Sequence, residues 1–303
     1  MEHLKQPQRI RPAPQLQREL PKWLNRALLL GTFATVLTLE LQRPLRQRTE
    51  HKGFHDARNL AMAILSALTL GLVERPVTKV LTQIVHRKRW GIVKQFKLPP
   101  WLEVVFAVVL LDYTLYLWHV LTHRMPCLWR FHRVHHSDVD LEASTALRFH
   151  GVEMLLSVPW RAVQIVVIGA SRLSLAIWQT LTLMAILWHH ANIRLPLKSE
   201  RWLCRLLMTP RMHGIHHSIV QEETNANFST ILSWPDYLHG TYRLNVPQQE
   251  IRIGVPEYRQ LKDLTFWQLL RMPFAYQGSL EHCNANTRLL KSNHPIPRGR
   301  LSA

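Results

Sequence analysis

The 303-residue chain contains little cysteine, and none of it is clustered. Its three cysteines, Cys127, Cys204 and Cys283, lie far apart and form no CxxC pair. This spacing excludes a disulfide framework and a thiolate metal site, and it favours a reducing compartment. The chain also lacks a GxGxxG loop and a CxxCH haem-attachment motif, so electrons for any redox reaction would come from a separate protein.

Acidic residues are scarce relative to basic ones. There are 20 Asp and Glu against 38 Lys and Arg, which gives a formal net charge of +18. Such a charge suits either nucleic acid or the anionic face of a membrane. The hydrophobic residues decide between the two, because they gather in a few long runs and no basic recognition element stands apart from them. We therefore expect a membrane protein that does not bind nucleic acid. The polar first residues lack the apolar core of a signal peptide, so we expect no cleavage.

Four apolar stretches approach the length of about 20 residues that crosses a hydrocarbon core as a helix. They are 24–41, 57–73, 152–170 and 173–188. The alternative is that some of them are buried helices of a soluble α-protein. We predict an all-α fold, an integral membrane helical bundle with about four spans and a cytoplasmic, histidine-rich helical cap.

The two stretches 152–170 and 173–188 are separated by only two residues, which predicts a tight helical hairpin that returns the chain to the face it left. The blocks 119–150 and 189–303 then lie on the same side of the membrane. Both blocks are basic, and the positive-inside rule makes their side cytoplasmic.

A fifth apolar stretch, 101–118, carries Glu103 and Asp112. We expect it to be re-entrant or interfacial, so that the first two spans form a hairpin with residues 42–58 as its outer loop. That arrangement leaves five Lys or Arg in the outer loop. If 101–118 instead crosses fully, residues 75–100, with seven Lys or Arg, would lie outside.

The histidines carry the strongest pattern, since eleven of the eighteen fall between positions 119 and 217. The motif HVLTH has two histidines at i and i+4, and HRVHH and HGIHH each have three at i, i+3 and i+4. On a helix these spacings place the imidazoles on one face, one turn apart. The eight histidines of these boxes are His119, His123, His132, His135, His136, His213, His216 and His217.

The number of histidines narrows the chemistry. A zinc peptidase would need Glu after the first histidine of HxxxH, but Val120 stands there. A catalytic zinc takes about three protein ligands and a water, so eight histidines are too many for one open metal site. Two metals with about three to five imidazoles each would use the set. Imidazole binds iron, zinc, copper and nickel, so the ligand type alone does not name the metal.

In order along the chain, the segments DYTLYLWHVLTH, RFHRVHHSDVDLEASTALRFHGVE, HHANIRLP and TPRMHGIHHS resemble the fatty acid hydroxylase / sterol desaturase superfamily. The resemblance covers roughly residues 101–243 and extends into ETNANFSTILSWPDYLHGTYR. It implies metal ligands at the eight box histidines. His150 and His190 match further positions where relatives have histidine and are included as candidate ligands, with a supporting or structural hydrogen-bonding role as the alternative. His189 is expected to be a neighbour and His239 is left out.

The resemblance also implies a membrane di-iron centre, with dioxygen as co-substrate and a lipid that is hydroxylated or desaturated. Recombinant protein is expected to carry zinc in some preparations. The electron donor would be a separate ferredoxin or b-type cytochrome. Two other classes stay open: a non-redox zinc-dependent membrane metalloenzyme acting on a lipid, and a metal sensor or transporter.

The expected organisation has three parts. Residues 1–100 form a basic tail and a membrane hairpin, 101–243 form the di-iron catalytic domain with the membrane hairpin 152–188, and 244–303 form a polar tail. The expected membrane is the inner membrane of a bacterium or the endoplasmic reticulum of a eukaryote. Four aromatic residues flank the boxes and are candidates to line a lipid cleft: Trp118, Phe131, Phe149 and Trp188.

Overall fold

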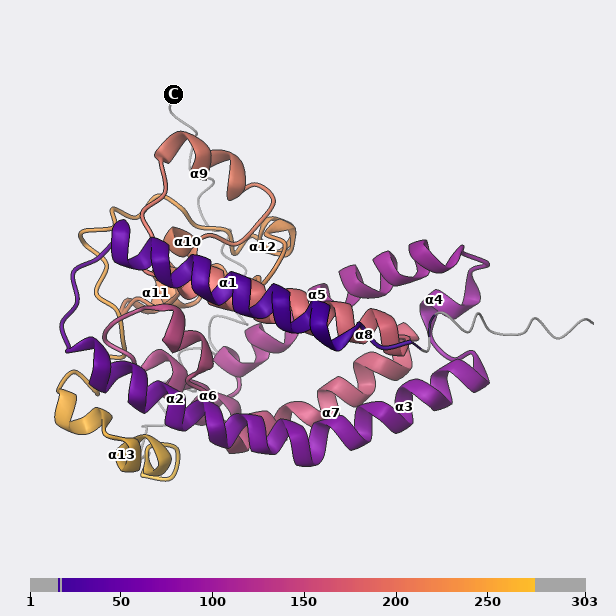
Figure 1. Cartoon of the computed structure of the whole chain (residues 1–303). Coiled ribbons are helices and arrows are strands. Elements are labelled where there is room, and N and C mark those ends of the chain that lie inside the picture. Colours follow the sequence, from indigo (N-terminus) through magenta and orange to yellow (C-terminus); the bar gives the residue numbers. More distant parts are fainter. Residues whose placement is uncertain (1–15, 17, 276–303) are drawn as a thin grey trace, which may run out of the picture.

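The computed structural model describes residue 16 and residues 18–275. Across these residues the regular structure is helical, and the only β-pairing is two isolated bridges. Long helices lie side by side as a bundle, and short helices gather at one end of it (Figure 1). This confirms the prediction of an all-α fold. The ends of the predicted basic and polar tails, 1–15 and 276–303, lie outside the described residues.

The bundle contains most of the long helices. They are α1 (Lys22–Gln42), α2 (Lys52–Thr69), the π-helical turn η2 (Leu70–Glu74), α3 (Arg75–Lys88), α5 (Pro100–Arg124), α7 (Gly151–Ile168) and α8 (Arg172–His190), with the short α4 (Ile92–Gln95) at the far end. Four runs are long and apolar enough to cross a membrane: α1, Lys52–Gln95, α5 and α7. The prediction of about four spans in an integral membrane protein is confirmed.

The remaining elements form a cap at one end of the bundle (Figure 1). They are α6 (Pro126–His136), η3 (Ala143–Leu147), α9 (Leu197–Leu203), α10 (Pro210–His216), α11 (Gln221–Thr224), α12 (Trp234–His239), η4 (Leu261–Leu264) and α13 (Phe266–Arg271). Part of the predicted polar tail therefore belongs to the cap. Leu264, Leu269 and Met272 are fully buried there against Met62 and Val134.

The helices α2, η2 and α3 form one continuous rod of roughly 55 Å, much longer than the ~30 Å of hydrocarbon in a bilayer. Its first half lies along the cap, where His55 and Asn59 contact Asp138. The second half remains to cross the membrane. The π-helical turn ends two residues before Pro76, which has no N–H to donate to the previous turn, so the proline accounts for the local widening of the helix.

Residues 101–118 differ from expectation, because they lie in α5, an uninterrupted helix of 25 residues. The helix contains no re-entrant turn, and α5 is one of the runs long and apolar enough to cross a membrane. The acidic groups that suggested it are both paired inside the protein: Glu103 binds Lys94, and Asp112 accepts from the backbone N–H groups of Ile231 and Leu232 at 3.2 and 3.1 Å. Neither carboxylate has to face lipid.

The connection between α1 and α2, residues 43–51, also differs from expectation. The backbone N–H groups of Thr49 and Glu50 donate to Asp140 at 2.9 and 2.8 Å, and that of Arg46 donates to Asn192 at 2.7 Å. The predicted outer loop thus lies at the cap end, on the same side as the histidine boxes. The prediction failed because it counted one crossing too few before the boxes.

α7 and α8 run in opposite directions, as the predicted hairpin requires, but they pack mainly against neighbouring helices rather than against each other. The turn is held at the far end by two glycines whose backbones touch: a Cβ on Gly91 would lie 2.1 Å from the Gly169 nitrogen. Gly169 also has a φ of 86°, in the left-handed region that glycine adopts without strain. Because α7 and α8 run in opposite directions, the chain returns to the cap with the second group of histidines (Figure 1).

Cysteine labelling tests this arrangement. We expect cysteines at the exposed positions Gln47 and Gln249 to react from one side of the membrane, and a cysteine at Lys97 from the other. Each is introduced on a background without the three native cysteines, and an impermeant thiol reagent is applied before and after the membrane is opened. Different behaviour of Gln47→Cys and Gln249→Cys would contradict the placement of the α1–α2 connection.

Candidate metal centre

Nine buried or half-buried histidines meet between the ends of the bundle helices and the cap, in two adjacent clusters. Within each cluster, one ring nitrogen from every member lies within 4.8 Å of those of the others. The five-histidine cluster contains His119, His123, His132, His136 and His216, and the four-histidine cluster contains His135, His190, His213 and His217. All eight box histidines and His190 are therefore brought together.

Each HxxHH motif serves both clusters, which sequence spacing alone did not predict. On a helix, residue i+4 lies about 40° from residue i in one sense and residue i+3 about 60° in the other. His132 and His136 accordingly point into the five-histidine cluster, while His135 between them joins the other. His213 in α10 and His217 directly after it share the four-histidine cluster, and His216 joins the five-histidine cluster. The two clusters touch where His136 and His217 stack, with ring centroids 4.2 Å apart.

The hydrogen bonds at the outer ring nitrogens point lone pairs into the clusters. The Nδ1–H groups of His119 and His216 donate to the carbonyls of Phe228 and Ala226 at 2.7 and 2.8 Å. In a neutral ring, Nε2 is then an acceptor without a hydrogen. The two Nε2 atoms nevertheless face each other at 3.0 Å. Two facing lone pairs repel, and a cation between them would relieve that repulsion.

Other ring nitrogens in the clusters are buried without any hydrogen-bond partner. They include Nε2 of His123 and His132 and both nitrogens of His136. A buried polar atom left unpaired costs roughly 1–3 kcal/mol. Several such atoms converging on one point are the arrangement expected of ligands to a metal ion, so the donor set fits two imidazole-bound metals.

Burial sets the protonation of these rings. Loss of hydration, with a smaller contribution from neighbouring histidines, holds the pKa well below its usual value for His135, His136, His213, His216 and His217. The imidazoles are therefore neutral near pH 7, which is the form that coordinates a metal.

A carboxylate orients one of the ligands. The Nδ1–H group of His132 donates to Glu153 on α7 at 2.6 Å, and Nε2 of the same ring points into the five-histidine cluster without a partner. Such a carboxylate fixes the tautomer and the orientation of the ring. Glu153 is the last residue of the segment RFHRVHHSDVDLEASTALRFHGVE, but the sequence alone did not predict a role for it.

We expect Glu153→Ala to lower metal affinity and activity roughly 10- to 100-fold. Glu153→Gln keeps an oxygen that accepts from His132 and should lose less. Metal retained after dialysis against a chelator gives the affinity, and Leu156→Ala, at an exposed position of the same helix, is the control. Wild-type metal retention in Glu153→Ala would contradict this role.

The segment 225–241 holds the carbonyls that orient His119 and His216. Asp236 accepts from the backbone N–H groups of Phe228 and Ser229 at 2.9 and 3.0 Å. Asn227 adopts a left-handed backbone conformation with φ 55°, and its side chain donates to the Met212 carbonyl in α10 at 3.0 Å. The segment is thereby tied to the helix that carries the last histidine box.

A fully buried ionic network supports the other side of the centre. Asp138, two residues after His136, binds Arg148 at 3.0 Å and His55 at 2.9 Å. Burial by itself would raise the pKa of Asp138, but the charges of Arg148 and His55 outweigh it and hold that pKa well below its usual range. Thr145 also donates to this carboxylate, at 2.8 Å. The network therefore joins α2 of the bundle to the loop that follows α6.

Three other histidines discussed in the sequence analysis do not join the clusters. His150, a predicted ligand, is the N-cap of α7: its Nδ1 accepts from the Val152 N–H at 3.1 Å, and its Nε2 donates to the Leu270 carbonyl at 3.3 Å. Both nitrogens are occupied, so the structure does not bring His150 to either metal position. His189 lies beside His213, as a neighbour outside the four-histidine cluster, and its Nδ1 donates to Thr230. His239 is exposed.

Of the four aromatic residues noted in the sequence, Phe149 stacks on a histidine of the four-histidine cluster. Its ring stacks on His135, with centroids 4.4 Å apart and an interplanar angle of 8°. Trp118 packs on Trp160, and Trp188 donates to the Met208 carbonyl. The sequence did not predict two other aromatic side chains, Trp129 and Phe228, which pack against the five-histidine cluster.

Comparisons with known proteins agree with this centre. The family model described as "Fatty acid hydroxylase" matches residues 104–241, which contain every clustered histidine. The chain is similar to ornithine lipid hydroxylase OlsE of Rhizobium tropici, with 32% identity over 59% of this chain and 52% of that protein.

Two animal proteins are also similar. Rat cholesterol 25-hydroxylase is 28% identical over 46% of this chain and 47% of its own length. Human alkylglycerol monooxygenase is 26% identical over 75% of this chain and 49% of its own length. The chain thus matches about half the length of these relatives, and no solved structure matches it. The resemblance inferred from the histidine boxes is confirmed.

Proposed function

We propose, from the premise that this chain carries a fatty acid hydroxylase domain, that the protein is a membrane di-iron monooxygenase that hydroxylates an alkyl carbon of a membrane lipid. One observation carries the proposal: two adjacent clusters of five and four imidazoles, buried where the cap meets the bundle. The three relatives named above are hydroxylases or monooxygenases by name, which favours hydroxylation over desaturation.

The reaction balances as a monooxygenation. One lipid C–H group, one dioxygen, two electrons and two protons give one alcohol and one water. A C–H bond of an alkyl chain resists acid–base chemistry, and the metal pair supplies the one-electron and dioxygen chemistry that the side chains lack. The histidines of the two clusters would hold the metals. Glu153 and the carbonyls of Phe228 and Ala226 would fix their rings, and the surrounding aromatic side chains would exclude water.

We propose that the two electrons come from a separate ferredoxin or b-type cytochrome. Exposed basic residues gather around α9 on the cap, and an acidic carrier would be attracted to them. These residues are Arg194, Lys198, Arg201 and Arg205. The same charge supports a cytoplasmic cap. In the labelling experiment above, Lys97→Cys should then be the variant that reacts in intact cells.

Lipid profiling tests the proposed function. Cells producing the wild-type chain should accumulate a lipid that is heavier by one oxygen, and cells producing His136→Ala should not. Ornithine lipid is the first substrate to supply, because the Rhizobium relative is named for it. A lipid lighter by two hydrogens would assign desaturation instead. A lipid change without oxygen consumption would support the zinc-dependent alternative and overturn the proposal.

A further inference from the structure

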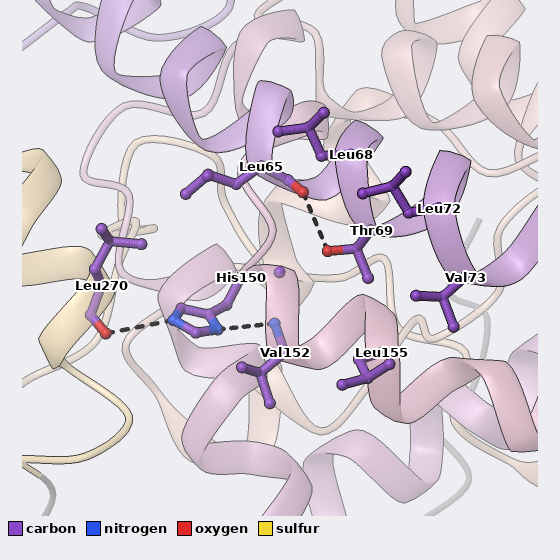
Figure 2. Close-up of a pocket in the computed structure, with 10 residues that line it drawn as sticks. Leu65, Leu68, Thr69, Leu72, Val73, His150, Val152, Leu155 and Leu270 are labelled. Carbon is purple, nitrogen blue, oxygen red and sulfur yellow. Dashed lines mark hydrogen bonds between the residues drawn. The ribbon is translucent and has the colours of Figure 1, made fainter.

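An apolar groove lies at the junction of the bundle and the cap. It has a volume of about 420 Å³, within the range of ligand pockets, and is bordered by α2 and η2 on one side, the start of α7 on the other and α13 at its end (Figure 2). Its lining residues are Leu65, Leu68, Thr69, Leu72, Val73, His150, Gly151, Val152, Leu155 and Leu270.

The shape of the groove follows from one glycine at the helix crossing. A Cβ on Gly151 would lie 3.3 Å from the Thr69 hydroxyl, closer than most side-chain contacts. The first turn of α7 therefore packs tightly on α2 at this point, and the leucines on either side of the contact form the walls. A larger residue at 151 would fill the floor of the groove.

The polar side chains among the lining residues have no free hydrogen-bond donor to present to a ligand. The Thr69 hydroxyl donates to the Leu65 carbonyl at 3.2 Å, and both nitrogens of His150 are engaged within the protein (Figure 2). A ligand with polar groups at this level would lose its hydrogen bonds to water without replacement. The groove therefore suits a hydrocarbon chain.

The outer wall of the groove is open to the surroundings of the bundle. Leu72, Leu68 and Leu155 are 75%, 53% and 46% exposed, and they lie on runs that are long and apolar enough to cross a membrane. The exposed leucines are therefore continuous with the surface that faces lipid. A chain in the bilayer can reach the groove sideways, without passing through water.

Two consecutive residues connect the groove to the metal centre. His150 lines the groove, and the ring of Phe149, directly before it, stacks on His135 of the four-histidine cluster. The Phe149 carbonyl accepts from Ser66 on α2 at 2.9 Å, beside the groove residue Leu65. The segment 149–150 therefore contacts the groove through one residue and the four-histidine cluster through the other.

We propose that this groove holds the alkyl chain of the lipid that the metal centre oxidises. The reacting part of the chain would pass the Phe149 ring to reach the centre. The proposal rests on the proposed function and adds the site and the class of its ligand, an acyl or alkyl chain of a bilayer lipid. It makes Leu72 and Leu155 specificity-determining residues, because they shape the groove without touching the metal centre.

Two tryptophan substitutions test the groove, each with a matched control on the same helical run. Leu72→Trp and Leu155→Trp fill it, whereas Val80→Trp and Val163→Trp add the same ring at exposed positions outside it, where the native side chains are 53% and 55% exposed. We expect the first pair to lower lipid oxidation at least about tenfold, since a misplaced substrate reacts far more slowly, with metal content unchanged. The control pair should keep wild-type rates.

A direct binding measurement accompanies the rates. The protein is placed in bilayers containing a phosphatidylcholine with a photoactivatable diazirine at the end of one acyl chain. Labelling of the peptides that contain 65–73 and 151–155 should fall severalfold in Leu155→Trp and persist in Val163→Trp. Wild-type oxidation and labelling in both groove variants would overturn the proposal that the groove binds the alkyl chain. Absence of any lipid oxidation by the wild type, with groove labelling retained, would instead overturn the proposed function.

Discussion

Replacing either His136 or His217 with alanine is expected to abolish lipid oxidation, with a loss of roughly a thousandfold or more. The two residues belong to different boxes and different clusters, yet their rings stack at 4.2 Å where the clusters touch. Loss of one imidazole removes a ligand from one metal and a packed neighbouring ring from the cluster that would hold the other. Because the centre works as a unit, the double variant should be no worse than either single variant.

The control for this prediction is His239→Ala. His239 is exposed, lies outside both clusters and bonds Tyr113 at 3.0 Å, so its loss should leave oxidation near the wild-type rate. Oxidation rates are compared at equal amounts of membrane-inserted protein. Substantial activity in His136→Ala or His217→Ala would contradict the assignment of these ligands.

Asp138→Asn is expected to destabilise the protein by about 3–5 kcal/mol, the usual result of removing one partner from a buried ion pair. Arg148 is fully buried, and the substitution would leave its charge without the carboxylate that faces it at 3.0 Å. His55 would lose the same partner, so the contact between α2 and the cap should weaken.

Thermal unfolding of the protein in lipid nanodiscs measures this effect. Glu222→Gln, at an exposed position on the cap, is the matched control and should unfold with the wild type. Unfolding of Asp138→Asn at the wild-type temperature would show that the Asp138–Arg148–His55 network does not stabilise the cap.

The class of fold could be predicted because its signals are local. Apolar runs of membrane length and histidines at helical spacing each depend on a few adjacent residues. The two-residue interval between 152–170 and 173–188 was likewise sufficient to predict that the histidine blocks meet. The fold places them as that hairpin requires.

The path of the first half of the chain depended on pairing that spacing does not reveal. Glu103 and Asp112 argued against a crossing by 101–118, but their partners are Lys94 and the backbone of residues 231–232. The second of these partners is more than a hundred residues away. Once α5 crosses, the α1–α2 connection must move to the cap end.

In the candidate site too, features set by adjacent residues could be predicted and features set by distant contacts could not. The eight box histidines could be found from sequence, and the structure brings all of them together. His150 could not be separated from them, because its role as the N-cap of α7 depends on where that helix begins. Glu153 and Asp138 were missed, because a carboxylate that orients a ligand is recognised only by the ring or guanidinium that it contacts.

Metal content measured together with activity tests the di-iron centre most directly. Protein purified in an active state should contain two iron ions per chain, bound through imidazole nitrogen, and lipid oxidation should rise in proportion to iron when stripped protein is reloaded. Recombinant protein that carries zinc should be inactive until the zinc is exchanged. One metal ion or fewer per chain in a fully active preparation would contradict the two-cluster centre.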